Sequence, residues 1–157
     1  MIELVIVILI MGIMTALAAP TFYDSLLFHR VESAARRVKA DLELARTQAR
    51  LTSTNRTVTF VNSKYTISNT KSLDNANYVY TVDLKLAPYA LDSATANFSN
   101  LAAVSFDGYG GPSSGGTVEV VAKAHKCTLT LDGTTGEITI TSSHTGGRVS
   151  QTQSTTN

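Results

Sequence analysis

The sequence of 157 residues has little cysteine, little histidine and little charge. Its one cysteine, Cys127, excludes a disulfide within the chain. His29, His125 and His144 have no metal-ligand spacing with one another or with Cys127, so we expect no metal site. Charged residues make up 16% of the chain and the net charge is +1, which gives no strong field to attract nucleic acid. No nucleophile elbow or phosphate-binding loop occurs either, so we expect no catalysis and no cofactor.

Charge is absent altogether from Leu4 to Tyr23, a run of 20 residues. A secretory signal peptide would begin with basic residues, which Met1-Ile2-Glu3 does not supply, although Ala16 to Ala19 resembles a cleavage site. A core helix is the second option, but a helix that is apolar on every face presents more apolar surface than a domain this small can bury. A membrane anchor is the third, because about 20 apolar residues cross a bilayer. We predict a transmembrane helix over residues 1–23.

The start of this run resembles the N-terminal signature of type IV pilins and pseudopilins. The resemblance is carried by Ile2-Glu3-Leu4-Val5-Ile6-Val7-Ile8-Leu9, by Met11-Gly12-Ile13 and by the interval of 17 residues from Glu3 to Pro20, where the family has a helix kink. It implies filament assembly through Glu3 and Pro20. In the family, the acid pairs with the N-terminal ammonium of a neighbouring subunit.

The family also has a basic leader that ends in Gly, which a prepilin peptidase removes before the new N-terminus is methylated. Here Met1 stands where the family usually has Leu. We therefore expect an in-frame leader upstream, with the peptidase as a partner if it is restored. As the sequence stands, Arg30, Arg36 and Arg37 follow the apolar run and no cation precedes it, which is opposite to the charge bias of an exported domain. Sequencing upstream of Met1 tests this expectation.

Residues 24–53 are expected to continue the helix as an amphipathic segment. Apolar residues step by three and four along it, so we predict that one face packs on a β domain. This predicted packing face consists of Leu27, Val31, Val38, Leu42, Ala45 and Ala49. The basic residues of the segment, Arg30, Arg36, Arg37, Lys39, Arg46 and Arg50, are interpreted as a solvated face, with acidic filament neighbours or lipid head groups as the alternative.

Residues 54–149 alternate with the period of two that is typical of strands, and we predict about seven short antiparallel strands. Residues 86–100 show no period, and residues 150–157 form a polar tail that we expect to be disordered. Cys127 is interpreted as a small buried strand residue, the three histidines as exposed, and the Gly-rich stretch 107–116 as a turn. The predicted fold class is α+β, a long N-terminal helix packed on a small antiparallel β-sheet domain, as in pilins.

A second resemblance covers most of the chain. The run Asp41-Leu42-Glu43-Leu44-Ala45-Arg46-Thr47-Gln48-Ala49, then a strand from Arg56, is similar to the H-type minor pseudopilin and FimT group (GspH-like); Ser105-Phe106-Asp107-Gly108 and Thr135-Gly136-Glu137-Ile138 add to the similarity. It implies a minor pseudopilin of a type II secretion system, with other pseudopilins as partners. It would be anchored in the bacterial inner membrane, with its C-terminal domain in the periplasm.

The same resemblance leaves open a FimT-like minor pilin that serves pilus assembly or DNA uptake. Some members of that group are credited with binding DNA through a Gly-Arg-x-Arg segment. In this sequence Gly147-Arg148-Val149-Ser150 keeps only the first arginine. Because few phosphates could be neutralised, Arg148 is a weak DNA-contact candidate and nucleic acid is not the expected partner.

Overall fold

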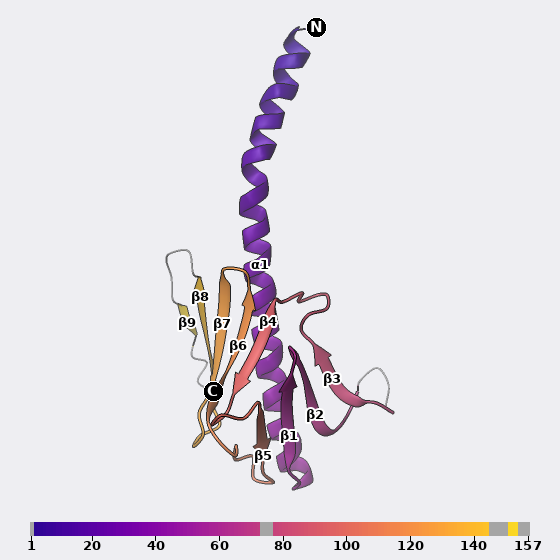
Figure 1. Ribbon diagram of the computed structural model, residues 1–157, viewed down its shortest axis with the longest axis vertical. Coiled ribbons are helices and arrows are strands. Elements are labelled where there is room, and N and C mark those ends of the chain that lie inside the picture. Colours follow the sequence, from indigo (N-terminus) through magenta and orange to yellow (C-terminus); the bar gives the residue numbers. More distant parts are fainter. Residues whose placement is uncertain (1, 73–76, 145–150, 154–157) are drawn as a thin grey trace.

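A computed structural model of the chain describes residues 2–72, 77–144 and 151–153; for residues 15–22, 144 and 151–153 it describes the backbone alone. A single helix, α1 (Ile2–Thr52), is followed by a domain of strands (Figure 1). At 1.5 Å per residue its 51 residues extend about 75 Å. The helix runs through Pro20 without a break, and the strands lie alongside only its C-terminal half (Figure 1).

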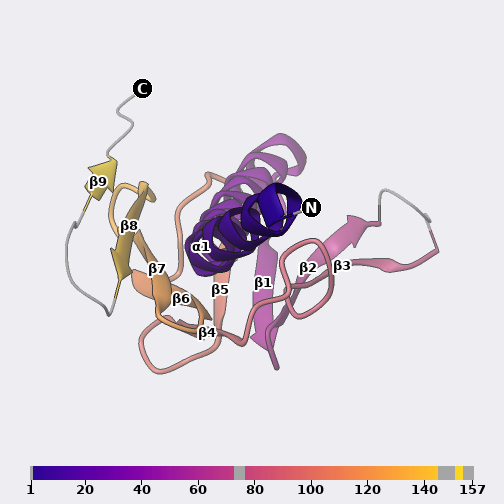
Figure 2. The same ribbon diagram turned by 90° about the horizontal axis from the view of Figure 1, so that it is seen from above.

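Among the described residues, nine strands form two antiparallel sheets, in the orders β3-β2-β1-β5 and β4-β6-β7-β8-β9. The strands are β1 (Arg56–Val61), β2 (Lys64–Lys71), β3 (Val79–Asp83), β4 (Ser93–Asn97), β5 (Ala103–Phe106), β6 (Gly116–Ala122), β7 (His125–Leu131), β8 (Ile138–His144) and β9 (Gln151–Gln153). Seen along the helix, one sheet lies on each side of it (Figure 2). This arrangement is the predicted α+β fold of a long helix on an antiparallel β domain.

The described residues form two strands more than the seven or so predicted, and these are β4 and β9. β4 is Ser-Ala-Thr-Ala-Asn, whose inward positions are two alanines, so its alternation is too weak in hydrophobicity to read as a strand. It is fixed instead by pairing with β6 from Ser93↔Val121 to Asn97↔Thr117. Of the tail expected to be disordered, 151–153 form β9, whose backbone pairs with β8; residues 150 and 154–157 lie outside the described residues.

The core lies between the two sheets and the C-terminal half of α1. Its larger members are aromatic residues on the inward positions of strands and loops: Phe60, Tyr65, Phe98 and Phe106. Phe60 stacks at 5.4 Å from Tyr65 and 6.2 Å from Phe98, centroid to centroid. Cys127 is buried on β7, as predicted. Within the described part of the chain, no helical stretch has both the length and the apolar character needed to cross a bilayer.

Candidate assembly site

The C-terminal half of α1 presents an apolar stripe to both sheets. It packs on β1 and β5 of one sheet and on β6, β7 and β8 of the other. Ala34 and Ala35 are buried beside the predicted packing face. All six residues of that face are also buried: Leu27, Val31, Val38, Leu42, Ala45 and Ala49. Alanines along the stripe let the helix approach the sheets closely. The stripe fixes the β domain to this half of the helix, and residues 2–14 of the other half are exposed.

From Ile2 to Met14, α1 carries large apolar side chains that nothing in the described part of the chain covers. Ile2 is 78% exposed and Met14 is 71% exposed. The large apolar residues between them are 49% to 67% exposed. Gly12 has no atom within 4 Å of the position of a Cβ. Glu3 is exposed in the first turn. Pro20 lies inside the helix, but its side chain is outside the described residues. Contiguous exposed apolar surface of this kind marks a contact site for other proteins or for membranes.

Asp41 lies at the edge of the buried stripe and is itself buried, with 5% of its surface exposed. Three donors converge on its Oδ2: the hydroxyl of Tyr65, the hydroxyl of Tyr80 at 2.8 Å and Nε of Arg37 at 3.1 Å. The Tyr80 oxygen also accepts a hydrogen bond from Nη2 of Arg37 at 2.5 Å. The three partners satisfy a carboxylate that would otherwise be costly to bury, and they tie the helix to β2 and β3.

The pKa values of the two tyrosines follow from this position. Burial first, and then the neighbouring Asp41 carboxylate, raise the pKa of Tyr65 well above its usual range. The same causes raise the pKa of Tyr80, and Arg37 acts against them. Both hydroxyls therefore stay protonated and act as donors at neutral pH. The contact with Tyr80 and the charge of Asp41 raise the pKa of the Arg37 guanidinium against the opposing effect of burial.

The interpretation of the basic residues as a solvated face was wrong at two positions. Arg37 belongs to the Asp41 cluster just described. Arg46 donates to three backbone carbonyl oxygens: Gly110 at 3.0 Å, Gly136 at 3.0 Å and Thr135 at 2.8 Å. Arg46 therefore joins the helix to the β5–β6 and β7–β8 connections, because its planar fork of donors can reach several acceptors at once.

Glycine is required at two of the three positions whose carbonyl oxygens accept from Arg46. Gly110 has φ +83° and Gly136 has φ +68°, the left-handed region that L side chains rarely adopt. A Cβ on Gly136 would lie 2.9 Å from Cζ of Arg46, and a Cβ on Gly110 would lie 2.6 Å from Cδ of Arg50. The arginines approach the two loops as closely as they do because these residues have no side chains.

The interpretation of His125 as exposed was also wrong. His125 begins β7, is 5% exposed, and its Nε2 lies 2.8 Å from Oδ1 of Asp24 on the helix. The Phe28 ring packs edge-on against the His125 ring. In the adjacent turn, Lys123 Nζ lies over the ring of Tyr23, 5.0 Å from its centroid. These contacts hold the β6–β7 turn against the point where the helix leaves the β domain (Figure 1).

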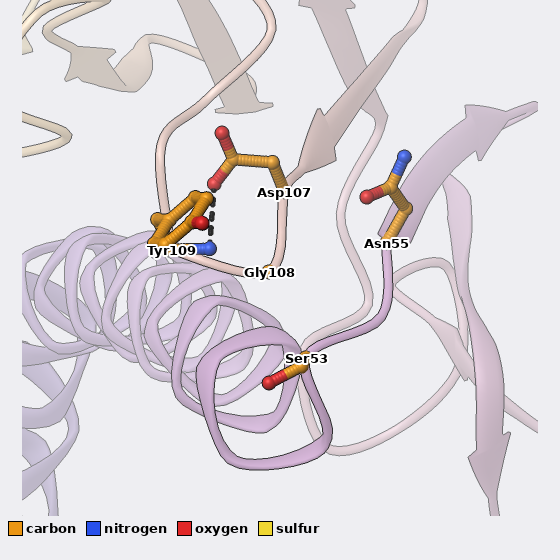
Figure 3. A pocket seen from close by; sticks show the side chains of 5 residues that line it. All are labelled: Ser53, Asn55, Asp107, Gly108 and Tyr109. Atoms are coloured by element: carbon orange, nitrogen blue, oxygen red, sulfur yellow. Dashed lines mark hydrogen bonds between the residues drawn. The ribbon is translucent and has the colours of Figure 1, made fainter.

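The Gly-rich connection after β5 lines a pocket of about 350 Å³ together with the end of the helix (Figure 3). Its lining residues are Ser53, Asn55, Asp107, Gly108 and Tyr109. Oδ1 of Asp107 accepts hydrogen bonds from the backbone N–H of Tyr109 and of Gly111, which fixes the turn. The pocket is open and the Tyr109 side chain is 92% exposed, so no enclosed reaction site is formed here.

The remaining candidate residues do not come together. Among the described residues, no group of three or more histidine, cysteine or acidic side chains could hold a metal ion. Burial, with the charge of Glu32 as a smaller cause, raises the pKa of the Cys127 thiol to about 11. His29 is exposed on the helix. The DNA-contact candidate Arg148 lies outside the described residues.

Comparison with known proteins gives a family match and a match of fold. Residues 34–155 match the family described as Type II transport protein GspH. The fold is similar to that of the crystal structure of the type IV minor pilin FimU of Pseudomonas aeruginosa strain PAO1, with a TM-score of 0.53 and 16% sequence identity, over 70% of this chain and 87% of that one. No curated protein sequence matches the chain.

Proposed function

This chain belongs to the GspH family of type II transport proteins, and from this premise we propose that it is a minor pseudopilin of a type II secretion system. In this role it would be a structural subunit of the pseudopilus that helps to export folded proteins across the outer membrane. The observation that carries the proposal is the division of α1 into an exposed apolar stretch from Ile2 to Met14 and a C-terminal half fixed to a β domain. The subunit would act by assembly and would catalyse no reaction.

The proposal assigns residues 1–23 to the inner membrane and the β domain to the periplasm. It is supported by the 20 uncharged residues from Leu4 to Tyr23 and by the exposed side chains from Ile2 to Met14. In a filament the same surface would pack against the helices of other subunits, which replaces lipid by protein without exposing apolar area to water. One surface thus serves the subunit both before and after it leaves the bilayer.

Glu3 is proposed as the residue that sets the axial position of the subunit in the filament. A carboxylate near the end of an apolar helix is costly to place in hydrocarbon and gains most from a cationic partner. The N-terminal ammonium of a neighbouring subunit would be such a partner. Pro20 is proposed to assist by interrupting one backbone hydrogen bond and easing a bend of the helix.

Crosslinking in membranes tests this role. With the protein expressed from its native locus, Glu3→Gln should insert normally but crosslink less to neighbouring pilin-like subunits, and Glu3→Asp should recover part of the loss. An exchange in the β domain, Thr95→Ser, is the matched control on an exposed side chain. Unchanged crosslinking of Glu3→Gln at equal membrane abundance would reject the pairing and leave the anchor unaffected.

A FimT-like minor pilin in pilus assembly or DNA uptake is the second candidate, and its support is the likeness of the fold to a type IV minor pilin. Deletion of the gene separates the two. Loss of protein secretion with normal pili and normal uptake of DNA supports the type II assignment, and the reverse supports the pilin assignment. Arg148→Ala tests the DNA contact: uptake that falls with normal pilus numbers would give that residue a role.

A further inference from the structure

We propose that the end of the β domain nearest the anchor is a contact surface for anionic phospholipid head groups, centred on Lys123. This inference rests on the proposed anchoring of residues 1–23. The surface, here called the proximal rim, consists of the β6–β7 turn with Lys123 and the β3–β4 connection over residues 84–92. Both lie at the end of the domain where the helix emerges toward its N-terminus (Figure 1).

The level of the rim along the helix is fixed by contacts. Lys123 Nζ lies 5.0 Å from the centroid of the Tyr23 ring, and Tyr23 is the last residue of the uncharged run. The next residue, Asp24, holds His125 of the same hairpin at 2.8 Å. If Leu4 to Tyr23 fill the hydrocarbon, Lys123 is therefore at the depth of the head groups. Tyrosine is enriched at the same depth in membrane proteins.

The two parts of the rim form one unit. The backbone N–H of Lys123 donates to Oδ2 of Asp92 at 2.7 Å, and the N–H of Asp92 donates to the carbonyl of Val121 at 3.0 Å. The backbone of Lys123 has φ +52°, as in a tight turn. The side chain of Lys123 is exposed. The β3–β4 connection adds the exposed Lys85 and Leu86, the latter 62% exposed. A cation beside an exposed apolar side chain suits the boundary between head groups and acyl chains.

The cations of the rim suit this orientation. On the rim, Asp92 is the carboxylate beside Lys123, and it is occupied by the backbone of that residue. Asp24 faces His125. The other end of the domain carries both signs of charge, with Asp107, Asp132 and Glu137 in its turns and with Lys71, Arg46 and Arg50. The orientation therefore depends on the position of Lys123 and Lys85 next to the anchor, since basic groups next to a membrane strengthen binding to acidic lipids.

Lipid-dependent labelling of lysines in the full chain tests the proposal. The chain is reconstituted into phosphatidylcholine vesicles with and without about 30% phosphatidylglycerol, which supplies a negative surface potential, and exposed amines are acetylated and quantified by mass spectrometry. With phosphatidylglycerol at low salt, Lys123 should react about fivefold more slowly. The control is Lys71, exposed at the far end of β2, whose rate should not change. High salt should remove the difference.

Two variants test the rim without relying on the labelling of Lys123 itself. Lys123→Gln should also reduce the protection of Lys85, because the rim loses its main cation, whereas Lys71→Gln should not. Circular dichroism checks that both variants are folded. Equal labelling of Lys123 in the two kinds of vesicle, with the chain floating with both, would overturn the rim alone. Failure of the chain to float with either kind would overturn the anchor, and the rim with it.

Discussion

Removal of the Asp41 carboxylate should be among the most destabilising single changes on the helix outside its apolar stripe. In Asp41→Ala the Tyr65 hydroxyl is left buried without its acceptor, and the Tyr80 hydroxyl loses the same partner. A buried donor without a partner costs about 1–3 kcal/mol, and bonds to a charged acceptor are at the upper end of that range. The contact of Asp41 with Arg37 adds less, because the arginine side chain is 40% exposed and screened by water. The sum is a loss of about 3–5 kcal/mol.

Thermal unfolding of the full chain in detergent measures this loss. Near-ultraviolet circular dichroism of the tyrosines reports on the cluster itself. At about 2–4 °C per kcal/mol for a chain of this size, the midpoint should fall by roughly 10 °C. Tyr65→Phe is the matched control: it removes one donor and leaves Asp41 with Tyr80 and Arg37, so about half the loss is expected. A fall in Asp41→Ala no larger than in Tyr65→Phe would refute the idea that one carboxylate organises the cluster.

Three further predictions follow from named contacts. Stability should fall as the pH rises above about 10, because the unfolded chain then releases tyrosine protons that folded Tyr65 and Tyr80 retain; urea unfolding at pH 9 and 11 measures this, and Tyr65→Phe should flatten the slope. Arg46→Lys should lower the free energy of unfolding by about 1–3 kcal/mol, because a lysine ammonium lacks the planar fork of donors that reaches three carbonyl oxygens. A loss below about 0.5 kcal/mol in urea unfolding would contradict the role given to the guanidinium. Cys127, buried and with its pKa raised to about 11, should react with a thiol reagent at pH 8 only when the domain unfolds; rapid labelling of the native protein would show that the strand opens.

Periodicity was sufficient to predict the framework of the fold. The stripe of α1 steps by three and four, and strands such as β1 and β7 alternate, so the sequence pattern alone predicts a long helix on an antiparallel domain. β4 was not predicted because its inward residues are alanines, and β9 because polar residues carry no alternation in hydrophobicity. Both strands depend on neighbours that are distant in sequence, β6 in the first case and β8 in the second.

The polar contacts were missed for a different reason. Arg37 and Asp41 are four residues apart, which the sequence shows, but it does not show that Tyr65 and Tyr80 meet the same oxygen from two strands. One signal was available: tyrosines on the inward positions of strands need a partner for their hydroxyl groups, and acidic residues next to the stripe are candidates. Arg46 has no such signal, since its acceptors are backbone carbonyls in two loops.

The way in which the β domain holds α1 determines how the subunit responds to mechanical load. The buried stripe extends from Leu27 to Ala49, about 33 Å of helix, parallel to the direction in which a pull on the N-terminal half would act. Tension along the helix then loads these contacts in shear, all at the same time, and not one after another as in peeling. Asp24 with His125 lies near the start of this stretch and Arg46 near its end, so polar contacts resist sliding at both extremities. Under the proposed anchoring, a pull on the domain would be transmitted to the N-terminal half of the helix while the folded domain stays intact.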